Sequence, residues 1–594
     1  MEVLTFQQIL VFLVLAFILV SLYKEILGPS FTFMVAIAVL GVFGVLTPAE
    51  ILSGFANEQI AVIIMLLLLG DVIRKTGAVE NIFDKFFRSA KSYRGFLSRM
   101  TISIAGFSAF LNNTPLVALM MPYVHNWCRR NNISPSKFLI PLSYAAILGG
   151  SATLIGTSTN LIVNGLVVDQ KIIPGMPPLQ MFDFIWVGIP MILIGYVYLL
   201  FFGEKLLPSK SDVISEFSTK AREYVIEAKV RSNSHLIGKT IEEAGLKKLR
   251  GLYLVELVRD SYHYAPITPK VVLEKDDLLI FAGDTETIPD LISSSSGLSV
   301  PEVGMLVKKR KTEVIEIVIS QNSSIINKSV KEINFRGQYD AAILAVHRNG
   351  ERISRKIGDV VLKAGDVLLL FAGEDFISRT NNTQDFYFIS KVKDFVKLEP
   401  YKLAVLLGGT FLAIILSVFN VISLFMGLLI VILASLALKI TNPKELPKGI
   451  DYNLGLIIVL SLALGIAMIK SGTADMIANL IITIFKPLGL TGLLFGIYFI
   501  TTVLAAYVTN KAAVAIIFPI SLTMSVNLGL NPEPFVLIVA YAAAANFMTP
   551  IGYQTNLMVY GPGGYSFKDF FKVGFPLTII YMIVTVFILR MVFL

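Results

Sequence analysis

The chain has 594 residues, of which 55% are hydrophobic and only 16% are charged. Soluble globular domains carry about a quarter charged residues, so this composition excludes an ordinary soluble protein and indicates several membrane spans. A lone cysteine, Cys128, excludes an intrachain disulfide and a cysteine-rich metal site. The net charge of +9 fits basic loops beside a membrane better than it fits nucleic-acid binding.

Residues 1–205 are predicted to form a first transmembrane repeat. Its apolar runs have the length of a spanning helix, about 20 residues, but the run at 97–125 is interrupted by polar residues. We expect a re-entrant hairpin there, which enters the membrane and returns, among five crossing helices. These helices are predicted near residues 5–23, 31–46, 58–73, 138–167 and 182–203.

Residues 206–395 are predicted to be soluble and to contain two copies of one module. The string Asp277–Gly283 recurs as Asp366–Gly373 with one residue inserted. Each copy has β-rich apolar runs around a short helical stretch, expected at 240–244 in the first copy. The block therefore reads as two small α+β domains, with bounds at 206–298 and 299–395.

Residues 396–594 are predicted to repeat the scheme of the first block, with a second hairpin at 490–526. Five crossings are an odd number, so the second copy enters the membrane in the opposite orientation, as an inverted-topology repeat. The crossing helices of this block are predicted near residues 402–419, 421–438, 453–469, 534–560 and 570–592. The fold class expected is an α-helical polytopic membrane protein with two re-entrant hairpins.

The distribution of lysine and arginine predicts the orientation in the membrane. If the N-terminus lies on the outer side of the membrane, basic residues gather in the segments that then face the cytoplasm. Examples are Arg129, Arg130 and Lys137. The loops predicted on the outer side contain no lysine and no arginine. These loops are 47–57, 420–422 and 527–534. We expect a multi-pass protein of the plasma (inner) membrane with both termini outside and residues 206–395 in the cytoplasm.

The first predicted hairpin has the tip Asn112-Asn113-Thr114-Pro115. Proline suits the first turn of a helix, and Thr114 before it is a good cap, so a helix is predicted to start at Pro115. A helix start offers free N–H groups to an anion, and the carboxamide oxygens of Asn112 and Asn113 suit Na⁺. On this string alone, an ordinary tight turn between two spanning helices is an equal alternative.

The first predicted helix break is Gly156-Thr157-Ser158-Thr159-Asn160, inside an apolar stretch. Small residues can simply pack helices together in a membrane, but four successive hydroxyl and amide side chains are poorly explained that way. We expect an unwound loop whose carbonyls meet a cation and whose hydroxyls meet an oxyanion.

The second half has the tip Thr509-Asn510-Lys511 and a break that includes Thr549, Thr555 and Asn556. A lysine at this depth is a functional candidate, unless it extends to the membrane surface. Lys511 could neutralise an anionic substrate, or it could replace a second sodium ion.

The four polar strings contain no Asp or Glu. A proton-coupled carrier usually needs a titratable group within the membrane, so neutral oxygens favour Na⁺ as the coupling ion. The four histidines form no metal-ligand cluster in the sequence, and no nucleophile–base pair is visible, so an enzyme and an organic cofactor are not expected.

The tips NNTP and TNKA, with the breaks GTSTN and GYQTN, resemble the divalent anion/sodium symporter family of the ion transporter superfamily. The duplicated soluble block resembles a tandem of TrkA C-terminal (RCK-C) domains, an insertion typical of the sulfate-type branch. The resemblance implies an elevator carrier, in which a transport domain slides against a scaffold that also forms a homodimer. It implies a small anionic substrate and bound membrane lipid, and no nucleic acid.

The resemblance also implies which residues form the sites. The candidate substrate-binding residues are Asn113, Thr114, Thr157, Ser158, Thr159, Thr509, Asn510, Lys511, Thr555 and Asn556. The candidate Na⁺ ligands are Asn112, Asn113, Gly156, Asn160, Asn510 and Thr549. Neither tip has the Ser-Asn-Thr pattern of the dicarboxylate carriers, and this difference favours sulfate over a C4-dicarboxylate as the substrate. Because Lys511 lies at the second tip, the binding of a second sodium ion stays open.

Two further classes of protein remain as alternatives. The soluble tandem invites a potassium channel or transporter, but no TVGYG-type filter and no G-x-G-x-x-G loop is present. A membrane sensor, anchored by its spans, would leave the two matched interruptions without a role. The tandem itself could bind a cytosolic nucleotide or another small effector, or it could brace a dimer.

Overall fold

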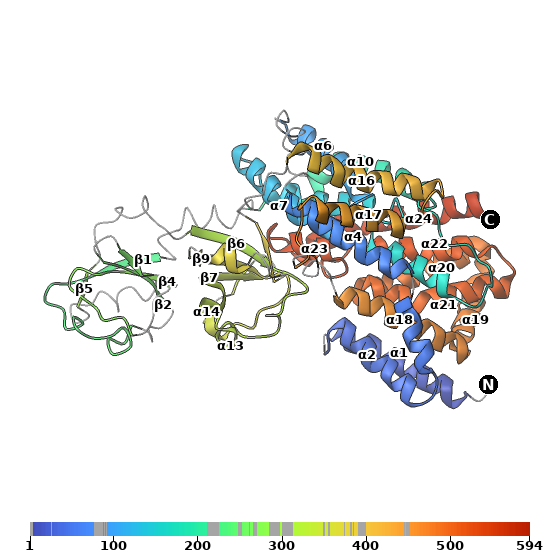
Figure 1. Cartoon of the computed structure of the whole chain (residues 1–594), viewed down its shortest axis with the longest axis horizontal. Coiled ribbons are helices and arrows are strands. Elements are labelled where there is room, and N and C mark those ends of the chain that lie inside the picture. Colours follow the sequence, from blue (N-terminus) through green and yellow to red (C-terminus); the bar gives the residue numbers. More distant parts are fainter. Residues whose placement is uncertain are drawn as a thin grey trace.

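The computed structural model consists of a helical body and two small β-sheet modules arranged along one long axis (Figure 1). It describes the chain from Leu4 onward, except for residues 25, 57, 77–82, 84–86, 88–89, 91, 211–224, 247–251, 260–261, 265–269, 284–296, 300–312, 349–350, 354–356, 374, 381–382, 384, 390–398, 445 and 447–451. The predicted boundary at 395/396 lies outside the described residues.

The helices of the first block follow the predicted order. Thr5 caps the first helix by a reciprocal bond pattern with Gln8, and Pro29 starts the second, so both begin where local chemistry favours a helix. The segment 47–57, predicted as a loop, holds a short helix. The bounds are α1 Phe6–Tyr23, α2 Pro29–Val42, α3 Pro48–Leu52, η1 Ser53–Ala56, α4 Glu58–Lys75, α6 Tyr93–Ser108, α7 Asn113–Arg130, α8 Leu139–Gly150, α9 Ser158–Asp169 and α10 Ile185–Leu206.

The second block has a corresponding series of helices, although most of the segment between α4 and α6 in the first block lies outside the described residues. The helix α19, which begins after the left-handed Gly472, was not predicted. Polar residues, from Lys470 to Asp475, lie at the end of α18 and the start of α19, and the positive φ of Gly472 separates the two helices. The bounds are α16 Pro400–Val418, α17 Leu424–Ala437, α18 Tyr452–Lys470, α19 Thr473–Phe485, α20 Gly489–Tyr507, α21 Asn510–Leu528, α22 Pro532–Ala544, α23 Gln554–Tyr560 and α24 Phe567–Phe593.

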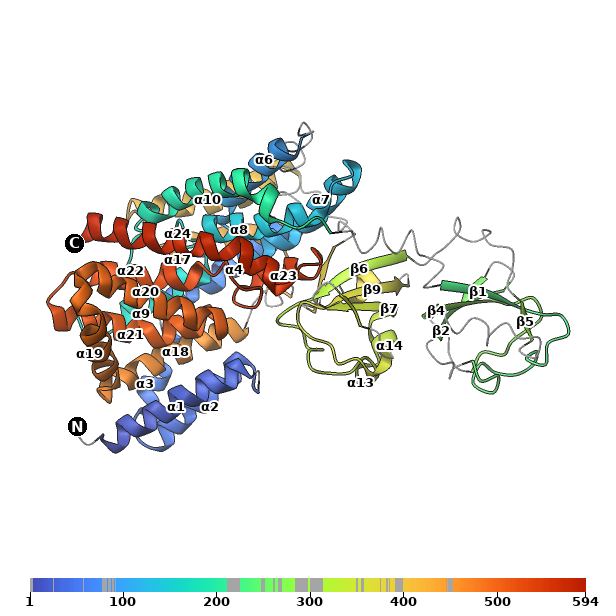
Figure 2. The ribbon, with the colours of Figure 1, turned by 180° about the vertical axis from the view of Figure 1, so that it is seen from behind.

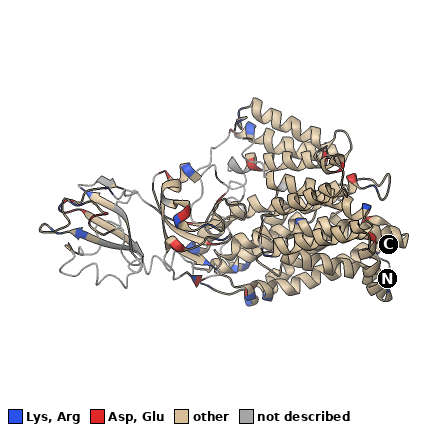
Figure 3. Ribbon diagram, turned by 90° about the horizontal axis from the view of Figure 1, so that it is seen from below, with Lys and Arg blue, Asp and Glu red and all other residues tan. Residues whose placement is uncertain are grey.

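Seven helical segments within the described residues are long and apolar enough to cross a membrane. They are Phe6–Tyr23, Pro48–Ile73, Ile185–Leu206, Pro400–Val418, Thr473–Tyr507, Asn510–Leu528 and Phe567–Phe593. Figure 3 shows long stretches of helix without a charged residue. The chain is therefore an integral, multi-pass membrane protein built mostly of helices.

Each β-sheet module is a five-stranded antiparallel sheet. The first has the order β3-β2-β4-β1-β5 and the second the order β10-β6-β9-β7-β8. The stretch 240–244, predicted as helical, consists of turns after a single bridge between Thr240 and Val272. The strands of the first sheet are β1 Val225–Val230, β2 Leu252–Arg259, β3 Tyr262–Tyr264, β4 Leu278–Gly283 and β5 Leu298–Ser299. Those of the second are β6 Glu313–Ile319, β7 Ala341–Arg348, β8 Glu351–Arg352, β9 Val367–Ala372 and β10 Phe386–Phe388.

An arginine–aspartate ion pair occurs at the same place in both modules. Arg259 donates to Asp277 at 2.7 and 2.8 Å, and Arg348 donates to Asp366 at 2.7 Å from both nitrogens. The two aspartates are almost fully buried, so each bidentate pair compensates a carboxylate removed from water. The second sheet lies against the helical body and the first lies farther out, as both views of the ribbon show (Figures 1 and 2).

Candidate functional site

The first hairpin tip lies between α6 and α7. The side chain of Asn112 caps α7 by accepting a bond from the Thr114 backbone N–H at 3.3 Å, and the helix begins at Asn113. The prediction of a Thr114 cap and a start at Pro115 is therefore wrong by two residues, because the short carboxamide of Asn112 reaches the free N–H first. The Thr114 hydroxyl instead donates to Gln554 Oε1, at 3.2 Å.

Asn113 is buried and joins both halves of the chain. The orientation of its carboxamide that satisfies both ends has the oxygen accepting from the Tyr553 hydroxyl at 2.6 Å. The nitrogen then donates to the carbonyl oxygens of Ala146 and Gly156, each at 3.2 Å. A Cβ on Gly150 would overlap this carboxamide, so a glycine in α8 is what allows the tip to approach so closely.

The first break lies between α8 and α9, and all of its residues from 151 to 157 are buried. It was predicted at 156–160, but it starts earlier, and Ser158, Thr159 and Asn160 form the first turn of α9. Thr153, which the sequence did not single out, organises the loop: its hydroxyl accepts from the Gly156 N–H at 3.2 Å, and its carbonyl accepts from Asn160 Nδ2 at 2.8 Å.

The second break repeats these hydrogen bonds. The Thr549 hydroxyl accepts from the Gly552 N–H at 3.1 Å, and the Thr549 carbonyl accepts from Asn556 Nδ2 at 3.1 Å. The predicted helix 534–560 is accordingly divided into α22 and α23. Two loops with the same internal bonds in the two halves show that the repeat extends from sequence to atomic detail.

The second tip lies between α20 and α21. The Thr509 hydroxyl caps α21 by accepting from the Ala512 N–H at 3.2 Å, and Asn510 and Lys511 follow on its first turn, both half-buried. Helices α7, α9 and α21 thus all begin at tips or breaks, and each directs the positive end of its dipole there. The site has the electrostatic character that suits an anion.

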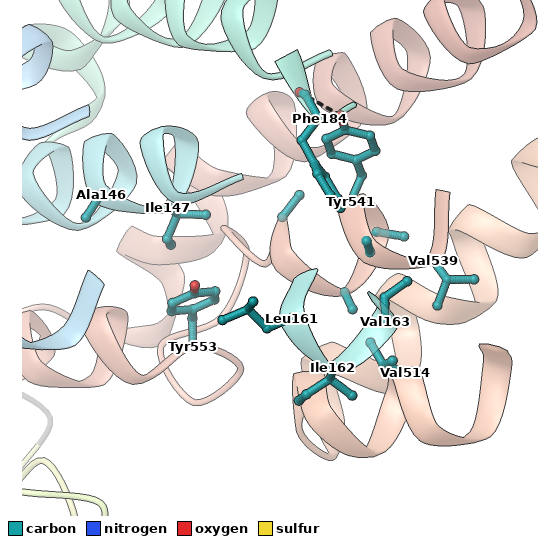
Figure 4. Close-up of a cluster of buried hydrophobic side chains, with 14 of the residues drawn as sticks. Ala146, Ile147, Leu161, Ile162, Val163, Phe184, Val514, Val539, Tyr541 and Tyr553 are labelled. Atoms are coloured by element: carbon teal, nitrogen blue, oxygen red, sulfur yellow. Dashed lines mark hydrogen bonds between the residues drawn. The ribbon is translucent and has the colours of Figure 1, made fainter. Parts of the chain in front are cut away.

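Tyr553 is one of the residues at which the two halves meet. Its hydroxyl contacts the Thr157 hydroxyl at 3.1 Å as well as the carboxamide of Asn113. Figure 4 shows its ring with the hydroxyl turned toward the helix that carries Ala146 and Ile147. No signal in the sequence marked Tyr553 as functional, because a buried tyrosine is ordinarily a core residue.

Ser143 ties α8 to the second break. Its hydroxyl lies 2.8 Å from the Thr555 hydroxyl and 2.7 Å from Asn556 Oδ1. Thr555 and Asn556 were both predicted to contact substrate, but in this structure their side-chain oxygens form hydrogen bonds with Ser143. Ser143 itself sits in an apolar stretch, where no sequence signal marked it.

Two other carboxamide oxygens, unlike that of Asn556, accept no hydrogen bond among the described residues. Asn160 Oδ1 and Asn510 Oδ1 are buried and have no hydrogen-bond partner among the described residues. Buried polar atoms are almost always paired, so an unpartnered oxygen beside a helix break calls for a ligand. Between the first tip and the first break, a cavity of about 30 Å³ has Asn112 and Ser158 in its wall. Apolar α4 side chains, among them Leu66, and Thr410 of α16 complete that wall.

No group of three or more His, Cys, Asp or Glu side chains comes together among the described residues. The polar atoms of the tips and breaks are hydroxyls, carboxamides and peptide groups, together with one ammonium group, that of Lys511. Such a set can hold an anion through donors and a hard cation through neutral oxygens, and it contains no carboxylate to carry a proton.

A repeated, membrane-embedded polar site at two pairs of helix interruptions is the hallmark of a secondary carrier. Residues 11–408 and 411–594 match the model of the citrate transporter family, and the chain belongs to this family. This match, together with the sodium/sulfate cotransporters among the relatives described next, confirms the resemblance to divalent anion/sodium symporters of the sulfate-type branch.

Curated relatives span almost the whole chain. A putative sulfur deprivation response regulator of Chlamydomonas reinhardtii is 34% identical over 91% of this chain and 94% of its own. An uncharacterized transporter of Synechocystis sp. is 31% identical, over 99% of this chain and 97% of its own. Sodium/sulfate cotransporter 1 of Chlamydomonas reinhardtii is 25% identical, over 99% of this chain and 90% of its own.

Proposed function

We propose that the protein is a sodium-coupled symporter of a small divalent oxyanion, with sulfate as the first candidate. The observation that carries the proposal is the pair of unpartnered, buried oxygens of Asn160 and Asn510 beside helix starts and hydroxyl groups. The unpartnered carboxamide oxygens need a cation, whereas the hydroxyls and the helix N–H groups offer hydrogen-bond donors to an anion. A carrier that moves both together satisfies both requirements.

The anion is held by donors alone. Sulfate is fully ionised at neutral pH and accepts hydrogen bonds without donating any, so hydroxyls, helix N–H groups and an ammonium suit it. The proposed contacts are Thr157, Ser158, Thr159 and Lys511, with Thr509 as the cap of α21. Thr114 remains a proposed contact, although its hydroxyl donates to Gln554 in this structure. Three sodium/sulfate cotransporters of Chlamydomonas reinhardtii, at 24 to 25% identity, support sulfate as the cargo.

The cation is assigned to the carboxamide oxygens. Na⁺ needs several oxygen ligands, and the Thr153 carbonyl of the first unwound loop lies beside Asn160. Asn112, Gly156 and Thr549 remain proposed contributors, although the Asn112 oxygen caps α7 and the Asn113 carboxamide is engaged by Tyr553. Lys511 occupies the place in the second repeat that Thr114 has in the first. Its ammonium either pairs with the anion or replaces a second sodium ion.

The family resemblance supports an elevator movement of the tips and breaks against the remaining helices, in a homodimer within the plasma membrane. On this proposal, residues 1–205 and 396–594 are the two oppositely oriented repeats, and the tips are re-entrant. The segments 206–298 and 299–395 are TrkA-C-like domains in the cytoplasm, open to a nucleotide or another small effector.

The proposal is tested by uptake of radiolabelled sulfate into proteoliposomes that contain the purified protein. We expect uptake that saturates with sulfate and stops when choline replaces Na⁺ outside. Unlabelled citrate and succinate, added in excess, show whether the site accepts organic anions as the family description suggests. Uptake that is equal in choline and in sodium would refute the coupling, and citrate competition stronger than that of sulfate would refute the proposed cargo.

A further inference from the structure

The second soluble sheet has two buried faces. Side chains alternate along a strand, so Ile317 and Ile319 of β6 point into the core of the module while Val318 points away from it. Val318 is nevertheless fully buried, because it belongs to the apolar cluster of the helical body. Val367 at the start of β9 and Ile389 after β10 are also fully buried and also belong to the apolar cluster of the helical body. The outward face of this sheet is therefore packed on the membrane-spanning part of the chain.

The contact brings backbone against backbone at α23. A Cβ built on Gly561, just after α23, would lie 2.7 Å from the Gly365 carbonyl oxygen and 3.8 Å from Val367 Cβ. Gly365 itself has φ of +82°, and a Cβ there would approach Leu557 of α23 to within 2.8 Å. Glycines on both sides thus permit the turn before β9 to rest on the helix that follows the second break.

A polar contact continues from this interface into the site. Gln554, the first residue of α23, donates from Nε2 to the Tyr387 hydroxyl of β10 at 3.1 Å. Its other end, Oε1, accepts from the Thr114 hydroxyl of the first tip at 3.2 Å. One glutamine side chain therefore connects the soluble sheet, the second break and the first tip.

The first soluble module lacks this face. In the second module Tyr387 pairs with Val318 across β10 and β6; in the first, the corresponding pair across β5 and β1 is Ser299 with Lys229. The Lys229 side chain is 45% exposed and forms an ion pair with Asp276 at 2.9 Å. A charged, partly exposed residue of the first module stands where the second module buries a valine. Among the described residues, the docking face belongs to the second copy.

We propose that Tyr387 is a positioning residue for the transport site, and that the docked second module holds Gln554, and with it the second break, in place. A displacement of this module then changes the shape of the site, which gives the soluble tandem a direct mechanical connection to it. The docking rests on the contacts above; only its effect on transport rests on the proposed function.

The first test uses Tyr387→Phe, which deletes the hydroxyl and keeps the ring, with Tyr264→Phe in the first module as the matched control. Hydrogen exchange is measured on the purified full-length protein without substrate. We expect faster exchange in peptides that cover residues 549–560 for Tyr387→Phe alone. Sulfate uptake by the same variant should show a KM raised about three- to tenfold at an unchanged maximal rate, as loss of one hydrogen bond predicts.

The second test uses Val318→Lys, which introduces the residue that the first module has at this position and leaves the module's own core intact. We expect faster exchange both in 549–560 and in the peptides of β6 and β9. Exchange in 549–560 equal to that of the unmodified protein in both variants would overturn the proposal, whatever the uptake assay shows. Faster exchange with no sodium-dependent uptake in any form of the protein would retain the docking and refute the proposed function instead.

Discussion

Asn160→Ala separates the structural role of a buried carboxamide from its role as a cation ligand. The substitution removes the bond from Nδ2 to the Thr153 carbonyl and leaves that carbonyl unpaired, which costs about 1–3 kcal/mol of stability. It also removes Oδ1, which has no partner among the described residues. If that oxygen contacts Na⁺, its loss is comparable to that of a hydrogen bond to a charged group, about 1.5–3 kcal/mol, or roughly a ten- to hundredfold weaker affinity.

Asn164→Ala is the matched control for this change. Asn164 lies one turn further along α9 and is also buried, but its Oδ1 already accepts from the Leu179 N–H at 2.8 Å. Both variants should lower the thermal midpoint of the purified protein by a similar amount. The half-saturating Na⁺ concentration for sulfate uptake should rise in Asn160→Ala alone. Equal sodium dependence in the two variants would refute Asn160 as a ligand.

Three further changes test other parts of the site. Tyr553→Phe deletes the hydroxyl that joins the first tip to the second break, and we expect a lower melting temperature by differential scanning fluorimetry, equivalent to about 1–3 kcal/mol. Gly552→Ala would drive a Cβ into the Asn546 carboxamide, so uptake should fall strongly, whereas Gly106→Ala, where a Cβ meets nothing within 4 Å, should leave it unchanged. Lys511→Gln should raise the KM for sulfate about tenfold or more if the ammonium is a counter-charge; an unchanged KM with an altered sodium Hill coefficient would show instead that the lysine replaces a cation.

Local chemistry alone indicated that the chain is interrupted at these places, but not the bounds of each interruption. A cap such as Thr509 favours the start of a helix because it acts on backbone groups within a few residues of itself. The shift of the α7 start to Asn113 shows the limit of this reasoning, since two neighbouring residues, Asn112 and Thr114, could each serve as the cap and geometry decided between them.

The sequence by itself therefore determined that this is a multi-pass membrane protein with two similar halves and polar strings at matching places. Only the tertiary structure decided which atoms of those strings remain available for a ligand. Asn160 Oδ1 has no partner in the part of the chain that the structure describes, whereas Asn556 Oδ1 is bonded to Ser143. Tyr553 contacts Asn113 from the opposite half of the chain. The physical reason is that a hydrogen bond depends on distance in space, and residues hundreds of positions apart become neighbours only when the two halves pack together.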